Sequence, residues 1–510
     1  MNYKEILSNY RGEVAGMLCD LVSFRSVNAE PLEGKPFGEE VHKAYAYMLE
    51  RGERDGFDAF DADGYGGHIE WPGAVTDERG EIVEAADGTL GVAVHLDVVP
   101  AGDGWAQDPW EGTLSDDGNI YGRGTTDNKG AVAAVYYAMK SLKEAGHAPS
   151  KNIRLILGLD EEVEWVGMDK YFEQAGQPDF GFAPDADFPV INGEKGILVF
   201  EIAKKFEGSH EAGLHLRSVT GGSAVNMVPD GCRAVLAYDN PSNASKGKGG
   251  KTRGKGKGKQ ASMAAKESAA RDKAFAFVKE AAAHNERTGA RISCKGVGTA
   301  LEVSAKGVSA HGSLPEKGVN AISVLMDFLS TLPIANESAR DFVDFYCTHI
   351  GHETDGKGLG IAMSDGLSGA LVVNIGMIAL NREAAVLSVN VRYPVSKTGE
   401  GVYEALMPAI DANGLGVVKE SDKPPLYYSE DEPFVRTLMD VYRENTGDAD
   451  SKPIVIGGGT YARSFPRAVA FGLRFPGEED ITHQKDERIN LDSLMKAAHI
   501  YADAIYRLTQ

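Results

Sequence analysis

The stretch Gly-Val-Ala-Val-His-Leu-Asp-Val-Val-Pro, residues 91–100, decides how the rest of this chain is interpreted. Its short run of valines and other apolar residues predicts a buried strand over residues 91–99, of the kind found in parallel sheets. Two polar residues, His95 and Asp97, interrupt this run near its end. Because residues i and i+2 of a strand point to the same face, we expect an imidazole and a carboxylate side by side. Buried polar groups need partners, so these two satisfy each other or a bound group satisfies them.

The composition is that of an ordinary globular protein with more than one domain. A chain of 510 residues exceeds a single hydrophobic core, and 42% hydrophobic with 25% charged residues is a common balance. The formal net charge of -22 argues against general binding to nucleic acid or to anionic membranes, both of which need basic surface. The amphipathic helix predicted over residues 1–27 carries acidic residues and is no signal peptide. No apolar run is long enough to span a membrane.

The four cysteines indicate a reducing compartment. They lie far apart in the sequence and form no Cys-x-x-Cys motif (Cys19, Cys232, Cys294, Cys347). This spacing is typical of buried thiols and not of a disulfide framework or a cysteine zinc site. We therefore expect a cytoplasmic enzyme.

The order of predicted elements divides the chain into two domains. Strands alternate with helices up to about residue 193 and again near the C-terminus, which predicts an α/β domain with a mainly parallel sheet and helices on both faces. Between these segments, alternating strands that are typical of antiparallel pairing mix with helices. We therefore predict a catalytic domain from residues 1–193 and 424–510 and an inserted α+β domain over residues 194–423.

One segment of the insert cannot form a core. Residues 245–259 alternate glycine with seven lysine or arginine residues and contain no acidic residue. Such a composition predicts a disordered loop, which we extend to about 241–262. The segment has no aromatic residue for stacking on bases, so we interpret it as a solvated loop and not as a nucleic-acid site.

Acidic residues follow the predicted strands of the first domain where each strand ends. Ligands bind at the carboxyl ends of the strands in open α/β sheets. The polar residues expected there are His95, Asp97, Asp127, Glu161, Glu162, Asp185 and Asp187, with His483 near the end of the chain. So many carboxylates could not all stay ionised together without a cation. Mixed His, Asp and Glu donors suit zinc, with manganese or cobalt as alternatives, and two ions sharing one carboxylate would balance the charge.

The adjacent pair Glu161 and Glu162 predicts a division of roles. Neighbouring side chains diverge, so one carboxylate can bind a metal while the other faces the substrate. A free carboxylate can take a proton from a water whose pKa a metal has lowered towards about 7. This arrangement predicts hydrolysis of an amide bond.

Together these motifs resemble those of the di-zinc aminoacylase/carboxypeptidase superfamily. The resemblance rests on His-Leu-Asp-Val-Val-Pro at 95–100, Gly-Arg-Gly-Thr-Thr-Asp-Asn-Lys-Gly at 122–130, Asp-Glu-Glu at 160–162 and the late His483. Two further stretches, 184–196 and 456–463, are similar to those of the PepV-like dipeptidases within it. The similarity runs from about residue 15 to the C-terminus. It implies a zinc-peptidase-like fold in which the inserted domain acts as a lid, and a monomer.

The resemblance also implies a role for each residue. One metal ion is expected on His95 and Asp185, the other on Glu162 and His483, with Asp127 bridging the two. Asp97 is expected to orient His95, and Asp187 is a less favoured rival of Asp185. Glu161 is expected to be the general base that later protonates the leaving amine.

In the insert, the resemblance implies three substrate-binding residues. His311 is expected to stabilise the tetrahedral oxyanion with help from Asn226, and Arg392 to clamp the free carboxylate of the substrate. Such a clamp would restrict cleavage to very short peptides. We further expect the backbone N–H groups of a turn at Gly458 and Gly459 to face that carboxylate. His349 and His352 have no evident carboxylate partner, so we interpret them as a helix end.

Three functions follow from these expectations. The first is a dipeptidase with two divalent ions, most simply Zn²⁺, acting on small unblocked dipeptides, with no nucleic-acid or membrane partner. The second keeps the site but acts on N-acyl amino acids. The third, a non-catalytic metal-binding or nucleic-acid-binding protein, predicts that the base or a ligand is missing, yet all six residues are present.

Overall fold

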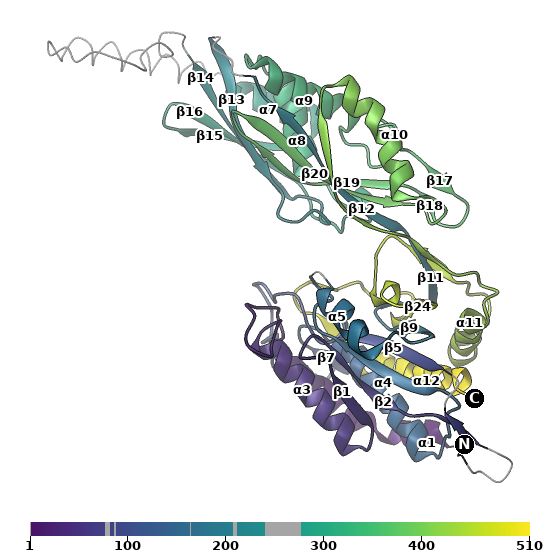
Figure 1. Cartoon of the computed structure of the whole chain (residues 1–510). Helices are drawn as coiled ribbons and strands as arrows, with labels where there is room; N and C mark the ends of the chain where they lie inside the picture. Colours follow the sequence, from purple (N-terminus) through teal and green to yellow (C-terminus); the bar gives the residue numbers. More distant parts are fainter. Residues whose placement is uncertain (1, 77–81, 86–87, 164, 208–211, 240–276) are drawn as a thin grey trace. The chain divides into compact units, whose positions relative to one another are not determined.

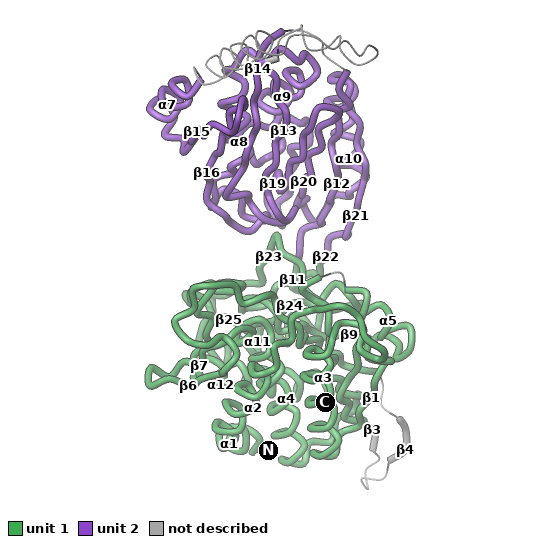
Figure 2. The backbone as a smooth tube through the Cα atoms, turned by 90° about the vertical axis from the view of Figure 1, so that its left-hand side faces the viewer, with its two compact units in different colours: residues 1–193, 427–510 green, residues 194–426 purple. Residues whose placement is uncertain are grey.

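A computed structural model describes residues 2–76, 82–85, 88–163, 165–207, 212–239 and 277–510. The chain divides into two compact units, which Figure 2 colours separately. Unit 1 comprises Met1–Gly193 and Tyr427–Gln510, and unit 2 comprises Glu194–Leu426. The glycine- and lysine-rich segment predicted to be disordered lies outside the described residues.

Unit 1 is built on a mixed sheet whose centre is parallel. The strand order is β1-β2-β8-β5-β9-β24-β11-β22, with β23 also paired to β11. β5 runs parallel to both β8 and β9, and β9 runs parallel to β24, whereas β1, β2 and β11 join by antiparallel pairing. The strands are β1 Asp58–Asp61, β2 Gly67–Trp71, β5 Thr89–His95, β8 Asn152–Gly158, β9 Phe180–Ala183, β11 Val190–Glu194, β22 Leu426–Tyr427, β23 Ile454–Ile456 and β24 Ala468–Phe471.

Helices cover both faces of this sheet, as predicted (Figure 1). Neighbouring residues of β2 show this: a Cβ on Gly52 of α3 would lie 2.9 Å from Ile69, while His68 contacts the hydroxyl of Tyr171 on α5. Because successive strand residues point to opposite faces, α3 and α5 lie on opposite sides. The helices of unit 1 are α1 Tyr3–Asn9, α2 Arg11–Ser23, α3 Glu39–Arg54, α4 Lys129–Glu144, α5 Val166–Ala175, α11 Pro433–Thr446 and α12 Leu491–Leu508, with the 3-10 turn η3 Tyr461–Arg463.

Two predicted elements of unit 1 differ from the structure. The single N-terminal helix is two helices, α1 and α2, which meet at Tyr10. The strand predicted over 91–99 ends at His95, so Asp97 follows the strand and does not belong to it. The apolar run continues past the last ladder partner, Gly158 opposite His95, and periodicity alone does not mark that end.

Short ribbons complete unit 1. β6 and β26 flank β7, β10 pairs with β25, and β3 pairs with β4. Their bounds are β3 Ala74–Thr76, β4 Ile82–Ala85, β6 Thr113–Leu114, β7 Asn119–Tyr121, β10 Ala186–Asp187, β25 Leu473–Arg474 and β26 Arg488–Asn490. Two of these ribbons join segments hundreds of residues apart, β7 with β26 and β10 with β25.

Unit 2 is an antiparallel sheet with helices, the α+β architecture predicted for the insert. The strand order is β15-β16-β14-β13-β19-β20-β12-β21. These strands are β12 Gly196–Lys205, β13 Gly213–Gly221, β14 Gly231–Asp239, β15 Arg291–Val297, β16 Ala300–Lys306, β19 Val372–Leu380, β20 Ala384–Tyr393 and β21 Gly416–Lys423. The hairpin β17 Ser364–Asp365 and β18 Gly369–Ala370 stands apart from it. The helices are α7 Phe277–Thr288, α8 Ala321–Ser330, α9 Glu337–His349 and α10 Gly399–Ala412, with the 3-10 turn η2 Pro315–Lys317.

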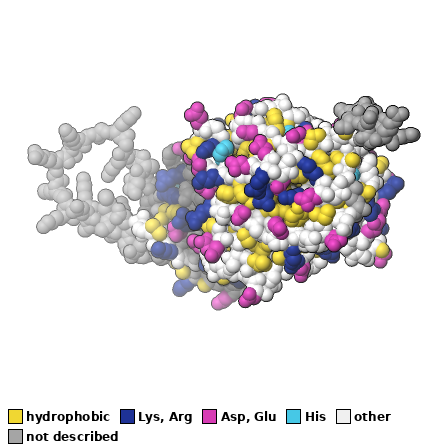
Figure 3. All heavy atoms as spheres, turned by 90° about the horizontal axis from the view of Figure 1, so that it is seen from below, with side chains coloured by type: hydrophobic (Ala, Val, Ile, Leu, Met, Phe, Trp, Pro, Cys, Tyr) yellow, Lys and Arg dark blue, Asp and Glu magenta, His cyan; other side chains and the backbone are white. Residues whose placement is uncertain are grey.

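Each unit has its own apolar core, in which helices pack against the strands of its sheet. In unit 1, α4 is buried along almost its whole length and packs against α12, α2 and α1. In unit 2, α8 and α9 pack together over the sheet. The surface shown in Figure 3 mixes acidic with basic side chains around a band of hydrophobic ones. Within the described residues, no helix combines the length and the apolar character that a membrane crossing needs.

Candidate metal centre

Three neighbouring parallel strands bring the predicted residues to one edge of the unit 1 sheet. His95 is the last residue of β5. Glu161 and Glu162 follow β8, and Asp185 follows β9. Since β5 lies between β8 and β9 and runs parallel to both, the carboxyl ends of all three meet there.

Asp127 lies between two imidazoles. It stands in the loop before α4, and its Oδ1 is 2.8 Å from His95 Nε2 while its Oδ2 is 3.0 Å from His483 Nε2. Burial by itself raises the pKa of Asp127, but hydrogen bonds from His483 and His95 outweigh it and hold that pKa well below its ordinary value. One carboxylate thus contacts two imidazoles, each through a different oxygen.

Glu162 and His483 form the second part of the site. His483 Nε2 lies 3.1 Å from the Glu162 carboxylate oxygens. Burial, and then the negative charge of Asp127, raise the pKa of Glu162 to about 7. Burial opposes charge on His483, but its hydrogen bonds to Asp127 and Glu162 raise its pKa to about 10. A metal ion binds the deprotonated carboxylate and the neutral imidazole, so metal binding at these donors would be coupled to proton release.

Asp185 is held against His95 by an asparagine that sequence reasoning missed. Asp185 Oδ1 lies 3.4 Å from His95 Nε2. The Asn128 side chain donates to Asp185 Oδ1 over 2.9 Å and to the Pro184 carbonyl over 2.8 Å. Its position beside Asp127 in the motif at 122–130 was the available signal.

Asp187, the rival of Asp185, is engaged elsewhere. Its two oxygens accept from Arg474 Nε and Nη2 over 2.6 and 3.0 Å, a bidentate pair. Arg474 also forms an ion pair with Asp480, in the segment that leads to His483. Arg474 thus connects Asp187 to the segment that precedes His483.

Asp97 contacts the site through its main chain and its side chain. Its carbonyl lies 2.9 Å from His95 Nδ1, whereas its Oδ1 is 3.5 Å from that nitrogen. A proton assigned to Nδ1 for this contact leaves the Nε2 lone pair for a metal. The Asp97 carboxylate accepts the backbone N–H groups of Glu161 and Glu162, both over 3.1 Å, and the Asn28 amide over 2.9 Å. One residue therefore contacts both the imidazole and the pair of glutamates.

The segment that carries Glu161 is held from both sides. Asp97 binds its amide, and Trp165 Nε1 donates to its carbonyl over 2.7 Å. Trp165 has a left-handed backbone, with φ 66°, which a bulky residue adopts only when its surroundings require it. Burial, and next the charge of Asp185, raise the pKa of the Glu161 carboxyl well above its ordinary value.

Tyr461, which sequence reasoning also missed as a site residue, packs against His95 and Trp165. Its ring stands edge-on to His95 at 6.2 Å and to Trp165 at 5.2 Å, and its hydroxyl donates to Asp160 over 3.3 Å. A Cβ on Gly158 would lie 2.2 Å from the Tyr461 ring, so that position needs glycine for close approach.

The donor atoms fit divalent metal ions. Ligand atoms of His95, Glu161 and Asp185 lie within 4.8 Å of one another, as do those of His95, Asp127 and Glu162. Imidazole nitrogen with carboxylate oxygen is a donor set that zinc accepts, and manganese or cobalt as well. The two groups share His95, and His483 adjoins the second through Asp127 and Glu162.

Two of the predicted substrate-binding residues lie together in unit 2. The Gly312 N–H donates to the Asn226 carbonyl over 2.6 Å, and Met227 pairs with His311. His311 Nδ1 lies 2.6 Å from Ser313 Oγ and 3.3 Å from the Ser313 amide, whose N–H donates to it. A neutral ring that accepts at Nδ1 carries its proton on Nε2.

Arg392 lies on β20 of the same unit and is 4% exposed. Its Nε donates to Asn390 Oδ1 over 2.8 Å. Opposite Asn390 in the ladder, Asn374 donates to the Val225 and Met227 carbonyls on either side of Asn226. Asn374, which has no sequence signature, thereby holds the Asn226 segment.

Gly458 and Gly459 lie between β23 and η3, where the Thr460 hydroxyl caps the 3-10 turn by accepting the Ala462 N–H over 3.2 Å. A Cβ on Gly458 would meet only Ile456, at 3.4 Å, so no close packing explains a glycine there.

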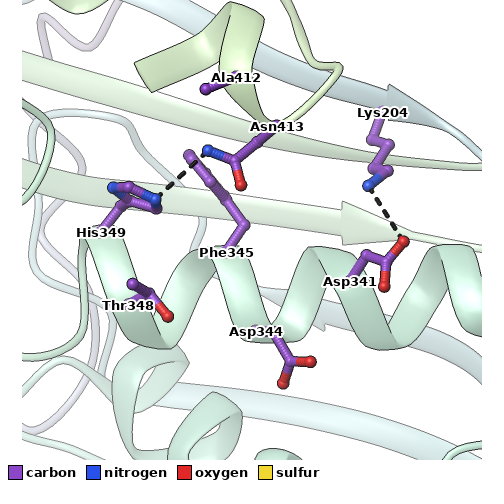
Figure 4. Close-up of a pocket in the computed structure, with 8 residues that line it drawn as sticks. All are labelled: Lys204, Asp341, Asp344, Phe345, Thr348, His349, Ala412 and Asn413. Atoms are coloured by element: carbon purple, nitrogen blue, oxygen red, sulfur yellow. Dashed lines mark hydrogen bonds and ion pairs between the residues drawn. The ribbon is translucent and has the colours of Figure 1, made fainter. Parts of the chain in front are cut away.

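A separate cavity of about 350 Å³ lies within unit 2 (Figure 4). Four of its polar side chains contact one another in pairs: Lys204 lies 3.7 Å from Asp341, and His349 Nε2 lies 3.3 Å from the Asn413 amide. α9 ends at His349, which confirms the interpretation of this histidine as a helix end. None of the predicted site residues lines this cavity.

Comparison with known families identifies a peptidase family. The model of peptidase family M20/M25/M40 matches residues 91–507. The chain belongs to peptidase family M20. This M20 enzyme is therefore a hydrolase that acts on peptide bonds.

Curated relatives of this M20 enzyme match it over more than nine-tenths of each chain. A Bacillus subtilis (strain 168) protein named "Putative dipeptidase YtjP" is 35% identical over 479 residues, which cover 94% of this chain and 92% of the relative. A Staphylococcus epidermidis protein named "Putative dipeptidase" is 34% identical over 512 residues, with 99% of each chain covered.

Solved structures share the fold. Human carnosine dipeptidase 1 matches with a TM-score of 0.56 at 15% identity, covering 100% of this chain and 98% of that one. Aminoacylhistidine dipeptidase from Vibrio alginolyticus matches with a TM-score of 0.53 at 14% identity, covering 97% and 96%. These structures support the predicted combination of a catalytic α/β domain with an inserted domain.

Proposed function

We propose that this M20 enzyme is a metal-dependent dipeptidase that hydrolyses unblocked dipeptides. The observation that carries the proposal is Asp127, whose two carboxylate oxygens each lie within 3.0 Å of a different imidazole, next to Glu162 and Asp185. The names of the curated relatives support the substrate class.

Two divalent metal ions are the cofactors that these donors fit, with zinc first and manganese or cobalt as alternatives. We assign His95, Asp127 and Asp185 to one ion, and Asp127, Glu162 and His483 to the other. Bound there, the ions would supply Lewis-acid activation of the attacking water and of the scissile carbonyl.

Glu161 is the general base in this proposal. Its carboxylate lies with the donors of His95 and Asp185, and its backbone is held by Asp97 and Trp165. It takes a proton from the attacking water and later delivers it to the leaving amine. In this proposal Glu162 binds a metal ion, while its neighbour Glu161 is the base. The Asp97 carboxylate accepts the backbone N–H groups of both and so positions the two residues together.

His311 stabilises the tetrahedral oxyanion. With Nδ1 accepting from Ser313, the proton on Nε2 is available as the donor that an oxyanion needs. Asn226, whose segment is joined to that of His311 by backbone hydrogen bonds, assists it.

Arg392 clamps the free carboxylate of the dipeptide, together with the N–H groups at Gly458 and Gly459. A planar guanidinium binds a carboxylate bidentately, and Asn390 fixes the orientation of its Nε. Such a clamp limits the length of the peptide. We further propose that the enzyme acts as a monomer in the cytoplasm, where its four cysteines, all within the described part of the chain, are free thiols.

A substrate panel tests the proposal. Protein stripped with a chelator is assayed before and after restoration with zinc, manganese or cobalt, on free dipeptides, a tripeptide and N-acetyl amino acids. We expect cleavage confined to free dipeptides and dependent on restored metal. Cleavage of the N-acetyl compounds instead would identify an N-acyl amino acid deacylase that uses the same site. Full activity in metal-free protein would contradict the mechanism.

A further inference from the structure

Glu487 is a buried carboxylate that accepts an unusual number of hydrogen bonds from one loop. The residue is 0% exposed. Its Oε2 accepts from Arg123 Nη1 over 2.6 Å and from the Gly124 amide over 2.9 Å. Its Oε1 accepts from the Thr126 amide and hydroxyl over 2.9 and 2.8 Å, and from the Asp127 amide over 3.3 Å. Five donors from residues 123–127 thus converge on a group with about four lone-pair sites.

The backbone of Glu487 belongs to the same arrangement. β26 pairs with β7 so that Arg488 lies opposite Tyr121, and the Gly122 N–H donates to the Glu487 carbonyl over 2.9 Å. Glu487 therefore continues the ladder between two segments more than 350 residues apart, and its side chain then lies along the loop that ends in Asp127.

Arg123 extends the contact to a third segment. It is 1% exposed, and its guanidinium lies 5.2 Å from the centre of the Trp105 ring. Trp105 in turn donates to the Ala101 carbonyl over 2.7 Å, in the chain that leaves β5 after His95 and Asp97. The Glu487–Arg123 ion pair is thus shared by the segments that carry His95, Asp127 and His483.

These contacts fix the position of Asp127. Its amide is bound by Glu487 and its two carboxylate oxygens face His95 and His483, so main chain and side chain are fixed from opposite sides. His483 precedes Glu487 by only four residues. A change at Glu487 would therefore displace the carboxylate that we propose as the bridging ligand relative to both imidazoles.

We propose that Glu487 is a positioning residue that holds Asp127 between His95 and His483 and thereby sets the affinity for two divalent ions. This inference rests on the proposed function, because it requires Asp127 to be the shared ligand. Glu487 itself contacts neither the ligand oxygens of Asp127 nor the substrate in this role. Residues that orient metal ligands commonly change metal affinity by about 10–100-fold when replaced.

The test is the metal affinity of E487Q. Glutamine keeps the shape but offers one acceptor oxygen, and its NH₂ group would face N–H or O–H donors in either orientation. The matched control is D503N, because Asp503 is also buried in unit 1 and accepts from Tyr3, Lys4 and Asn445 over 2.5–2.7 Å. Metal-free wild-type and variant proteins are titrated with Zn²⁺ or Mn²⁺ by calorimetry and by competition with a chromophoric chelator.

We expect E487Q to bind Zn²⁺ or Mn²⁺ about 10–100-fold more weakly than wild type, and D503N to bind with unchanged affinity at a comparable loss of thermal stability. Excess metal should restore kcat in E487Q while KM stays the same. T126V, which removes only the hydroxyl contact to Glu487 Oε1, should show a smaller loss of affinity. If E487Q does not fold, the metal affinity of T126V tests the proposal in its place.

Wild-type affinity in E487Q, or in T126V where E487Q does not fold, would overturn the positioning role. So would an equal loss of affinity in D503N, since the effect would then be one of general stability. Failure of the wild-type protein to bind two ions would instead overturn the proposed function. The two outcomes are distinguishable because the first is measured on the variants and the second on the wild-type protein.

Discussion

A single residue near the candidate metal centre can contact several site residues, some through its main chain and others through its side chain. Asp97 contacts the imidazole of His95 with its carbonyl and the amides of Glu161 and Glu162 with its carboxylate. A truncation of Asp97 would therefore disturb ligand and base together. The informative variants are those that change one group and leave its neighbours in place.

Glu161→Gln changes only the proposed base. We expect kcat to fall by about 10²–10⁴-fold, because the amide cannot accept the proton of the attacking water. Metal content measured after dialysis should match wild type. Glu162→Gln serves as the comparison, since it should lose metal. Turnover by Glu161→Gln at the wild-type rate would assign the base elsewhere.

Asp185→Asn and Asp187→Asn separate the two rivals. Asp185 faces His95, so its variant should bind metal more weakly. Asp187 is engaged with Arg474 and is partly exposed, so its variant should keep its metal and lose about 1 kcal/mol of stability or less. Elemental analysis and thermal unfolding measure the two effects. Loss of metal in Asp187→Asn alone would reverse the assignment.

At the scale of elements, two features decide the surroundings of a strand side chain. One is where the strand ends, and the other is the face of the sheet to which the side chain points. β5 ends at His95 between two parallel neighbours, which delivers an imidazole to the sheet edge. In β2, the same alternation places His68 inside the unit, 6% exposed, with its Nδ1 2.8 Å from the Tyr171 hydroxyl. Burial, and next the charge of Arg154, lower the pKa of His68 to about 3.

His68 predicts a loss of stability in mild acid. Because its folded pKa lies below the ordinary value of about 6.5, the unfolded chain binds the proton more readily as the pH falls from 6.5 towards 3. This group should remove about 1.4 kcal/mol of stability per pH unit in that range. Denaturant unfolding between pH 7 and 5 measures the slope. His68→Phe should reduce this slope by the share that His68 contributes.

At the scale of the whole molecule, the proposed metal ligands and the proposed oxyanion donor belong to different units. His95, Asp127, Glu162, Asp185 and His483 lie in unit 1, while Asn226, His311 and Arg392 lie in unit 2. Each unit has its own core. Metal binding and oxyanion stabilisation should therefore respond to mutation independently.

His311→Asn tests this independence. Removal of an oxyanion donor typically lowers kcat by about 10²–10³-fold. Since His311 belongs to unit 2 and the proposed ligands belong to unit 1, titration of the metal-free protein should give the wild-type affinity and number of ions. A parallel loss of metal would indicate that His311 is itself a ligand. A Ser313→Ala variant, which loses the contact to Nδ1, should show a smaller fall in kcat.

Much of the fold was predictable because it follows from local periodicity. Alternating strands and helices predicted the α/β unit, and the change of pattern after about residue 193 predicted the insert. Element ends were less predictable: the 91–99 strand ends at His95, and the first helix breaks at Tyr10. Such ends depend on ladder partners and packing that lie elsewhere in the chain.

The sequence by itself determined which chemistry this chain carries to the sheet edge, since parallel strands must bring their carboxyl ends together and with them His95, Glu161, Glu162 and Asp185. Only the tertiary structure decided how these groups are held. Arg474 donates hydrogen bonds to Asp187, and Asn128 donates one to Asp185. Glu487 accepts from the amide of Asp127, which lies 360 residues earlier in the sequence. The physical reason is that hydrogen bonds between segments far apart in the sequence form only where the fold brings those segments together. A local sequence pattern does not indicate which distant segments become neighbours.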